Sequence, residues 1–284
     1  MRERRHRATP DPGPAMDQEG RLRRIEGRHH RLVKNLRQAF HREEVSPEGY
    51  FAIEGLRIVE EAIRSGLKLR TVFFSASAQR KAERLLPQIS SHTETVLLED
   101  RLFRSAVRTE TPQGVAALVQ ARIFKLEDVL ERSQFGPIVV ITGLQDPGNL
   151  GTILRSAEAF EAAGVLLGEG TVSPLNWKAV RAAAGSVFRL PVVRVKMQEI
   201  LGPLREHGIR RLATAAHKGT PLPRAAMTGP LAIFLGGEGA GLGADLMRNL
   251  EEVVTIPHAE MVESLNAGVA GSLLLYEAWR QRKA

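Results

Sequence analysis

Six apolar runs in the second half of the chain constrain its fold more than any other feature. Each run is short, nearly continuous in apolar residues, and followed by a stretch with polar or helical character. They read IVVITGL, GVLLGE, LPVVRV, RRLATAA, LAIFLGGE and EVVTIP. Runs of this kind are typical of parallel strands that are buried on both faces. The second half is therefore predicted to be an α/β domain built on a parallel sheet.

The first half alternates strand-like and helical patterns in shorter segments, among them YFAIEG, LRTVFFSA and GVAALVQ. Its segment RLRRIEGRHHRLVKNLRQAFHREE is predicted to be one amphipathic helix, with an apolar stripe from Leu22 to Phe40 and a basic outer face. A chain of 284 residues favours two domains. We predict a disordered basic tail (1–19), a small α/β domain (20–120), a linker (121–136) and the parallel-sheet domain (137–284).

The positive charge is concentrated at one end of the chain. Residues 1–42 hold twelve Arg or Lys against five Asp or Glu, a balance of +7 out of +8 for the whole sequence. Such a segment fits either a polyanion-binding surface or a solubilising tail. The sequence has no cysteine, which excludes disulfides, thiolate metal sites and cysteine nucleophiles, and we predict no metal site. No apolar run approaches a membrane span, so a cytoplasmic location is expected.

The loop DPGNLGTILRSAEAF (146–160) follows the first strand of the second domain and continues into a helix. It resembles a phosphate-binding loop, because helix N-termini at the carboxyl edge of a parallel sheet bind anions. It lacks the Gly-Lys-Ser/Thr of a Walker loop and the order G-x-G-x-x-G. Nucleoside triphosphates and NAD are therefore poor candidates. Arg155 could reach back to a phosphate or a ribose, or it could be a surface arginine.

Two further polar loops follow strands in the same domain. FLGGEGAGLG (234–243) has five glycines around Glu238, more than a tight turn needs, which favours close backbone approach to a flat ligand. In IPHAEMVESLNAG (256–268), Ser264 or Asn266 could cap the last helix or orient a hydroxyl. The small residues Gly268, Gly271 and Ser272 of that helix fit either contact with another subunit or tight packing within one.

These three loops together resemble the three motifs of the SpoU or TrmH family of RNA ribose 2′-O-methyltransferases, within the SPOUT class. The motifs here are DPGNLGTILRSAEAFEAAGV, LGGEGAGL and IPHAEMVESLNAGVAGSLLLYEAWRQR, and SPLNWKAVRAAAGSVFRLPV between them is also similar. In the first domain, GYFAIEGLRIVEEAI and TETPQGV resemble the RNA-binding extension of the family. The resemblance covers residues 20–284. His258 and the pair Glu260–Met261 depart from the residues that are common in the family.

The resemblance implies a SPOUT domain with a trefoil knot, preceded by a small α/β RNA-binding domain. It also implies S-adenosylmethionine as cofactor, RNA as substrate, and a homodimer formed through the methyltransferase domain. The cofactor-binding residues carried over by position are Thr214, Gly236, Ile256 and Leu265. The catalytic residues carried over are Asn149, Arg155, Glu238, Ser264 and Asn266.

The first domain favours ribosomal RNA as the substrate, because family members that act on tRNA often lack this extension. Two alternatives stay open at this point. One is methylation of tRNA, and the other is an RNA-binding assembly factor that keeps the fold without catalysis.

Overall fold

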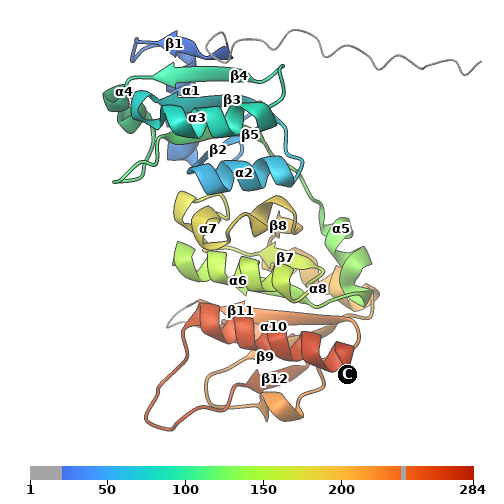
Figure 1. Ribbon diagram of the computed structural model, residues 1–284. Coiled ribbons are helices and arrows are strands. Elements are labelled where there is room, and N and C mark those ends of the chain that lie inside the picture. Colours follow the sequence, from blue (N-terminus) through green and yellow to red (C-terminus); the bar gives the residue numbers. More distant parts are fainter. Residues whose placement is uncertain (1–20, 238–240) are drawn as a thin grey trace, which may run out of the picture.

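The computed structural model describes residues 21–237 and 241–284 of the chain, as two stacked α/β domains (Figure 1). The predicted tail at residues 1–19 and the candidate residue Glu238 lie outside the described residues. No helix in the described part is both long and apolar enough to cross a membrane.

The N-terminal domain holds a mixed sheet with the strand order β1-β4-β3-β5-β2. Strands β1, β4 and β3 pair in parallel, whereas β5 pairs antiparallel with both β3 and β2. The strands are β1 (Arg23–Ile25), β2 (Tyr50–Glu54), β3 (Leu69–Ser75), β4 (Glu94–Leu98) and β5 (Val115–Gln120). The helices are α1 (Arg31–Arg42), α2 (Leu56–Arg64), α3 (Gln79–Leu85) and α4 (Asp100–Ala106), with the 3₁₀ turns η2 (Ala76–Ala78) and η3 (Leu86–Gln88).

The first helix of this domain begins later than the sequence pattern predicts. The prediction of a helix from Leu22 was wrong, because Arg23–Ile25 form strand β1 and pair with β4. A turn at Gly27 separates this strand from α1, where the His30 side chain accepts a hydrogen bond from the Leu32 backbone N–H. Ile25 is buried in the same cluster as the apolar face of α1. It is therefore apolar like the buried residues of α1, and its distance from them along the sequence also fits a helical period.

The C-terminal domain holds a fully parallel sheet in the order β10-β12-β9-β11-β6-β7-β8. The strands are β6 (Ile138–Thr142), β7 (Gly164–Leu167), β8 (Val192–Arg194), β9 (Arg210–Thr214), β10 (Thr220–Pro221), β11 (Leu231–Gly236) and β12 (Glu252–Thr255). The helices are α5 (Leu126–Leu130), α6 (Pro147–Ala159), α7 (Trp177–Ala182), α8 (Met197–Glu206), α9 (Ala244–Met247) and α10 (Ala267–Lys283). The 3₁₀ turns are η4 (Glu131–Gln134), η5 (Ser186–Phe188) and η6 (Leu222–Arg224). The predicted parallel sheet is therefore present.

Both faces of this sheet are covered, as the continuous apolar runs require. On β6, Val139 and Ile141 face the core that contains α6 and α10, whereas Ile138 and Val140 face the core under α5 and α8. Part of the predicted linker 121–136 contributes to the second core, because Val129 is buried there. The domain boundaries themselves stay a prediction.

Small residues let the helices α6, α7 and α10 pack closely within one chain. A side chain at Gly271 would meet Ile153 of α6 at 2.9 Å, and one at Gly151 of α6 would meet the Ala179 carbonyl oxygen of α7 at 2.6 Å. The Ser272 hydroxyl lies 2.7 Å from that of Ser156. The small residues of α10 therefore serve packing inside the subunit, one of the two roles that the sequence allows.

Arg189 links the two domains. Its guanidinium donates to Glu158 on α6 at 2.9 Å and to Glu61 on α2 of the N-terminal domain at 2.5 Å. Burial of Glu158 opposes its ionisation, but hydrogen bonds from Arg189 and Ser186 outweigh burial and hold the pKa of Glu158 below its ordinary value. Apolar contact between the rings of Phe51 and Phe188 adds to this junction.

Candidate functional site

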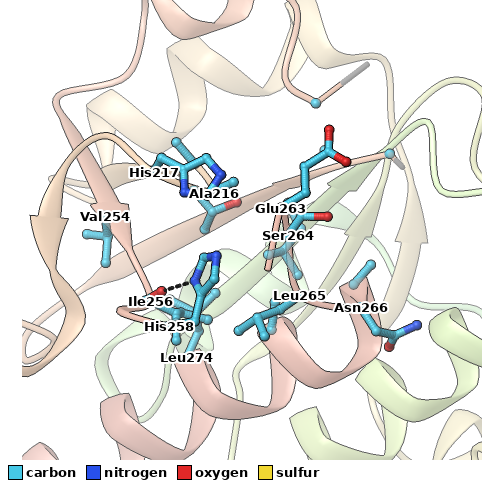
Figure 2. A pocket seen from close by; sticks show the side chains of 18 residues that line it. Ala216, His217, Val254, Ile256, His258, Glu263, Ser264, Leu265, Asn266 and Leu274 are labelled. Carbon is cyan, nitrogen blue, oxygen red and sulfur yellow. Dashed lines mark hydrogen bonds between the residues drawn. The ribbon is translucent and has the colours of Figure 1, made fainter. Parts of the chain in front are cut away.

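A cavity of about 660 Å³ opens at the carboxyl ends of β9, β11 and β12, beside the N-terminus of α10. Side chains from these elements surround it, as Figure 2 shows. Its volume lies within the range of about 300–1,000 Å³ that is usual for sites that bind small molecules and cofactors. Among its lining residues are Thr214, Gly236, Ile256, Ser264, Leu265 and Asn266. The structure thus brings six of the residues predicted from sequence to one place.

Two glycines at the end of β11, Gly236 and Gly237, have no room for a side chain. A Cβ atom at Gly236 would overlap the backbone of Gly241 and Leu242, and one at Gly237 would overlap the backbone of Gly143. Gly237 and Gly241 also form an isolated antiparallel bridge. Gly236 and Gly237 therefore let backbone segments pack closely against one another where β11 meets the cavity.

The loop before α10 is joined to the start of α6 by two asparagines. The Asn266 side chain caps α10 by accepting from the Val269 backbone N–H at 3.1 Å. Its amide nitrogen donates to Oδ1 of Asn149 at 2.9 Å. Helix α6 is capped by Asp146, which accepts from the Asn149 backbone N–H at 2.6 Å. The first and third motifs therefore meet at the rim of the cavity.

The remaining candidates differ in how they meet the cavity. The Thr214 hydroxyl donates to the carbonyl of Phe234 at 2.9 Å, so this side chain is engaged inside the sheet. Ile256 and Leu265 are half-buried and supply apolar surface. Ser264 is exposed at the rim. Within residues 21–237 and 241–284, no group of three or more His, Asp or Glu is placed to hold a metal ion.

Arg155 lies on α6 and is exposed to solvent, outside the cavity lining that the described residues form. Helix α6 begins at Pro147, so Arg155 lies about two turns from its start. Gly151 contacts α7 rather than open space, so it serves helix packing and not ligand approach. The first loop and its helix therefore offer an exposed positive side chain on the element that bears Asn149.

Two histidines at the cavity were not among the predicted site residues. His217 follows β9, and His258 follows the Ile256–Pro257 pair, with their ring centroids 5.2 Å apart. Only His258 carried a signal in the sequence, as a departure from the family pattern.

These features define an α/β domain with a partly polar cavity at the carboxyl edge of its parallel sheet. Comparison with known proteins identifies its family. The model of the SpoU rRNA Methylase family matches residues 136–276, and that of the MRM3-like substrate binding domain matches residues 30–117. The chain is 30% identical over 255 residues to 23S rRNA (guanosine(2553)-2′-O)-methyltransferase RlmP of Bacillus subtilis, covering 90% of this chain and 98% of that protein.

Solved structures give the same result. The SpoU methyltransferase AviRb from Streptomyces viridochromogenes in complex with the cofactor AdoMet has a TM-score of 0.79 and 28% identity, over 90% of this chain and 99% of that one. The AdoMet-bound rRNA methyltransferase from Sinorhizobium meliloti has a TM-score of 0.77 and 26% identity, over 92% and 98%. The chain belongs to the SpoU methyltransferase family, so the predicted family and α/β fold class are confirmed. The trefoil knot stays a prediction.

Replacing Gly236 by alanine should weaken binding of S-adenosylmethionine, expected here as the ligand of the cavity, by tenfold or more. The added Cβ has no space and must displace the Gly241–Leu242 backbone, and Gly241 lines the cavity. Gly243→Ala is the matched control, because a Cβ at Gly243 meets nothing within 4 Å. Calorimetric titration measures the affinity for S-adenosylmethionine, and thermal unfolding checks that each variant is folded. Normal binding by folded Gly236→Ala protein would contradict the assignment of the cavity.

Proposed function

We propose that the chain transfers a methyl group from S-adenosylmethionine to a ribose 2′-hydroxyl of ribosomal RNA. The enzyme class and cofactor predicted from sequence are confirmed by the family match and by relatives with bound AdoMet. Ribosomal RNA is supported by RlmP, which is named for 23S rRNA, and by the substrate-binding domain at residues 30–117. A cytoplasmic location fits an enzyme with this substrate and is part of the proposal.

The residues present fit this cofactor. Its nucleobase is flat, and the cavity pairs the backbone at Gly236 with apolar side chains at Ile256 and Leu265. We assign cofactor binding to these three residues and to the backbone at Thr214. The bound cofactor supplies a methyl group on a positively charged sulfur, which is electrophilic without further activation.

The observation that carries the proposal is the hydrogen bond between Asn149 and Asn266, because it joins the cofactor cavity to the helix that bears Arg155. The reaction then needs a ribose hydroxyl held in line with the methyl group, and such orientation can account for a large share of a rate. A guanidinium stays protonated in proteins, so Arg155 is a poor base and a good clamp for the phosphate beside the target ribose. The phosphate or water would then accept the hydroxyl proton.

The other polar candidates complete this assignment. Asn149 and Asn266 would position the ribose hydroxyl or the first loop, and Ser264 at the rim would assist them. Glu238 would hold Arg155 through a charge-assisted hydrogen bond. That last contact stays a prediction, because Glu238 lies outside the described residues.

Arg155→Ala should lower single-turnover methylation about a hundredfold while leaving cofactor affinity nearly unchanged, and Arg155→Lys should recover little. Lysine keeps the charge but lacks the planar fork that fixes a phosphate, and a small misplacement of the ribose costs about two orders of magnitude. Arg205→Ala on α8 removes an exposed arginine elsewhere and serves as control.

The assay uses methyl-labelled S-adenosylmethionine with unmodified ribosomal RNA and, in parallel, unmodified tRNA, followed by mapping of the labelled nucleotide. Label in a ribose of ribosomal RNA is expected. Label only in tRNA would establish the tRNA alternative, and no label in any RNA would favour the assembly factor. Wild-type rates in Arg155→Ala protein would make Arg155 a surface arginine.

The exposed side of α1 should contribute to RNA affinity through the phosphates of the RNA backbone. Arg31 and Lys34 are exposed on this helix, whereas Arg21 and Arg23 of the same segment are engaged with Ile89 and Glu94. Replacing Arg31 and Lys34 by glutamine should lower the salt slope of RNA binding by about one for each phosphate that is no longer neutralised. A variant with Lys196 and Arg205 replaced removes the same charge at α8. If the salt slope of RNA binding falls no further in the α1 variant than in the α8 variant, a specific role for α1 is ruled out.

The predicted homodimer is supported by apolar side chains left exposed on α10. Val269, Leu273 and Tyr276 lie on one face of the helix and are 49%, 40% and 46% exposed. Leu273→Glu should shift the protein to monomer in sedimentation equilibrium, because a charge would be buried at the interface. Ile123→Glu adds the same charge at an exposed apolar residue between the domains and should change nothing. A monomeric wild type would refute the dimer.

A further inference from the structure

His258 stands in the cofactor cavity with one ring nitrogen engaged and the other buried without a partner among the described residues. Nδ1 lies 2.7 Å from the carbonyl oxygen of Ile256. Nε2 is fully buried and makes no hydrogen bond within the described part of the chain. Figure 2 shows the ring between Ile256 and His217, on the opposite side of the cavity from Asn266.

The contact with Ile256 fixes the chemistry of the other nitrogen. A carbonyl oxygen only accepts hydrogen bonds, so Nδ1 carries the proton. In the neutral ring, Nε2 is then an acceptor. A buried acceptor without a donor is destabilising, and such groups in native proteins call for an explanation. A hydrogen-bond donor on a ligand in this cavity would satisfy Nε2.

The surroundings indicate which part of the cofactor supplies that donor. The cavity lining also includes the apolar side chains of Val254, Leu265 and Leu274, which suit a flat aromatic group. The charged ammonium of the methionine moiety would instead favour a carboxylate such as that of Glu263 at the rim. The methyl group must face the Asn149–Asn266 side, where RNA is proposed to bind. By elimination, the nucleobase is the part of the cofactor that would lie beside His258.

We propose that Nε2 of His258 accepts a hydrogen bond from the exocyclic amine of the cofactor's adenine, so that His258 selects the base of the cofactor. This rests on the proposed function, because it takes S-adenosylmethionine as the ligand. His258 is a positioning and specificity residue in this proposal. It takes no part in the methyl transfer, for which Arg155 is proposed to hold the RNA phosphate.

The test compares S-adenosylhomocysteine with S-inosylhomocysteine, in which a carbonyl oxygen replaces the amine. Neither compound has a transferable methyl group, so calorimetric affinity is the readout and catalysis plays no part. Wild-type protein should prefer the adenine compound by about tenfold or more, because the inosine carbonyl faces the Nε2 lone pair without a proton between them. Equal wild-type affinities for the two compounds would overturn the proposal without any variant.

Two substitutions separate recognition from loop structure. The amide of His258→Asn can replace Nδ1 and keep the bond to Ile256 but lacks the Nε2 position, whereas His258→Gln places an amide near Nε2. The ratio of the affinity for S-adenosylhomocysteine to that for S-inosylhomocysteine should fall towards one in the Asn variant. Part of the wild-type ratio should persist in the Gln variant. If the Asn variant loses affinity for both compounds equally, His258 only orders the loop, and the proposal fails. Weak binding of both compounds by the wild type would instead contradict the proposed function itself.

Discussion

The close contact between α6 and α10 is the constraint on which the rest of the site depends. Gly271 lets α10 approach Ile153 of α6, and this approach brings Asn266 within 2.9 Å of Asn149. One helix begins at the cofactor cavity and the other bears Arg155. A larger residue at Gly271 would separate the two helices and with them the two halves of the site. Packing in the core therefore determines the geometry at the surface.

The second constraint is the junction between the domains. Arg189 contacts carboxylates from both domains, Glu158 and Glu61, and is only partly exposed. A bidentate guanidinium between two carboxylates fixes orientation more narrowly than a single ion pair does. Asn176, which caps α7, adds a hydrogen bond to Glu43 at the end of α1. The N-terminal domain is thus held in a defined position relative to α6 and α7.

Much of the fold could be predicted from the sequence because burial on both faces leaves a clear pattern. The runs at 138–144 and 231–238 contain β6 and β11, neighbours in a parallel sheet. The first helix was predicted too long, because a strand as short as β1 has too few residues to show a period of two. The positions of Thr214 and Gly236 at one cavity followed from family motifs. His217 could not be predicted, since only the folded chain brings it beside His258.

The central claim is that one cavity holds the cofactor with its methyl group directed towards Asn149 and Arg155. A crystal structure of the protein with bound S-adenosylmethionine tests it most directly. The account predicts electron density for the cofactor between Gly236 and Leu265, adenine beside His258, and the methyl group facing the Asn149–Asn266 pair. Density at any other site, or a methyl group directed away from this pair, would contradict the account.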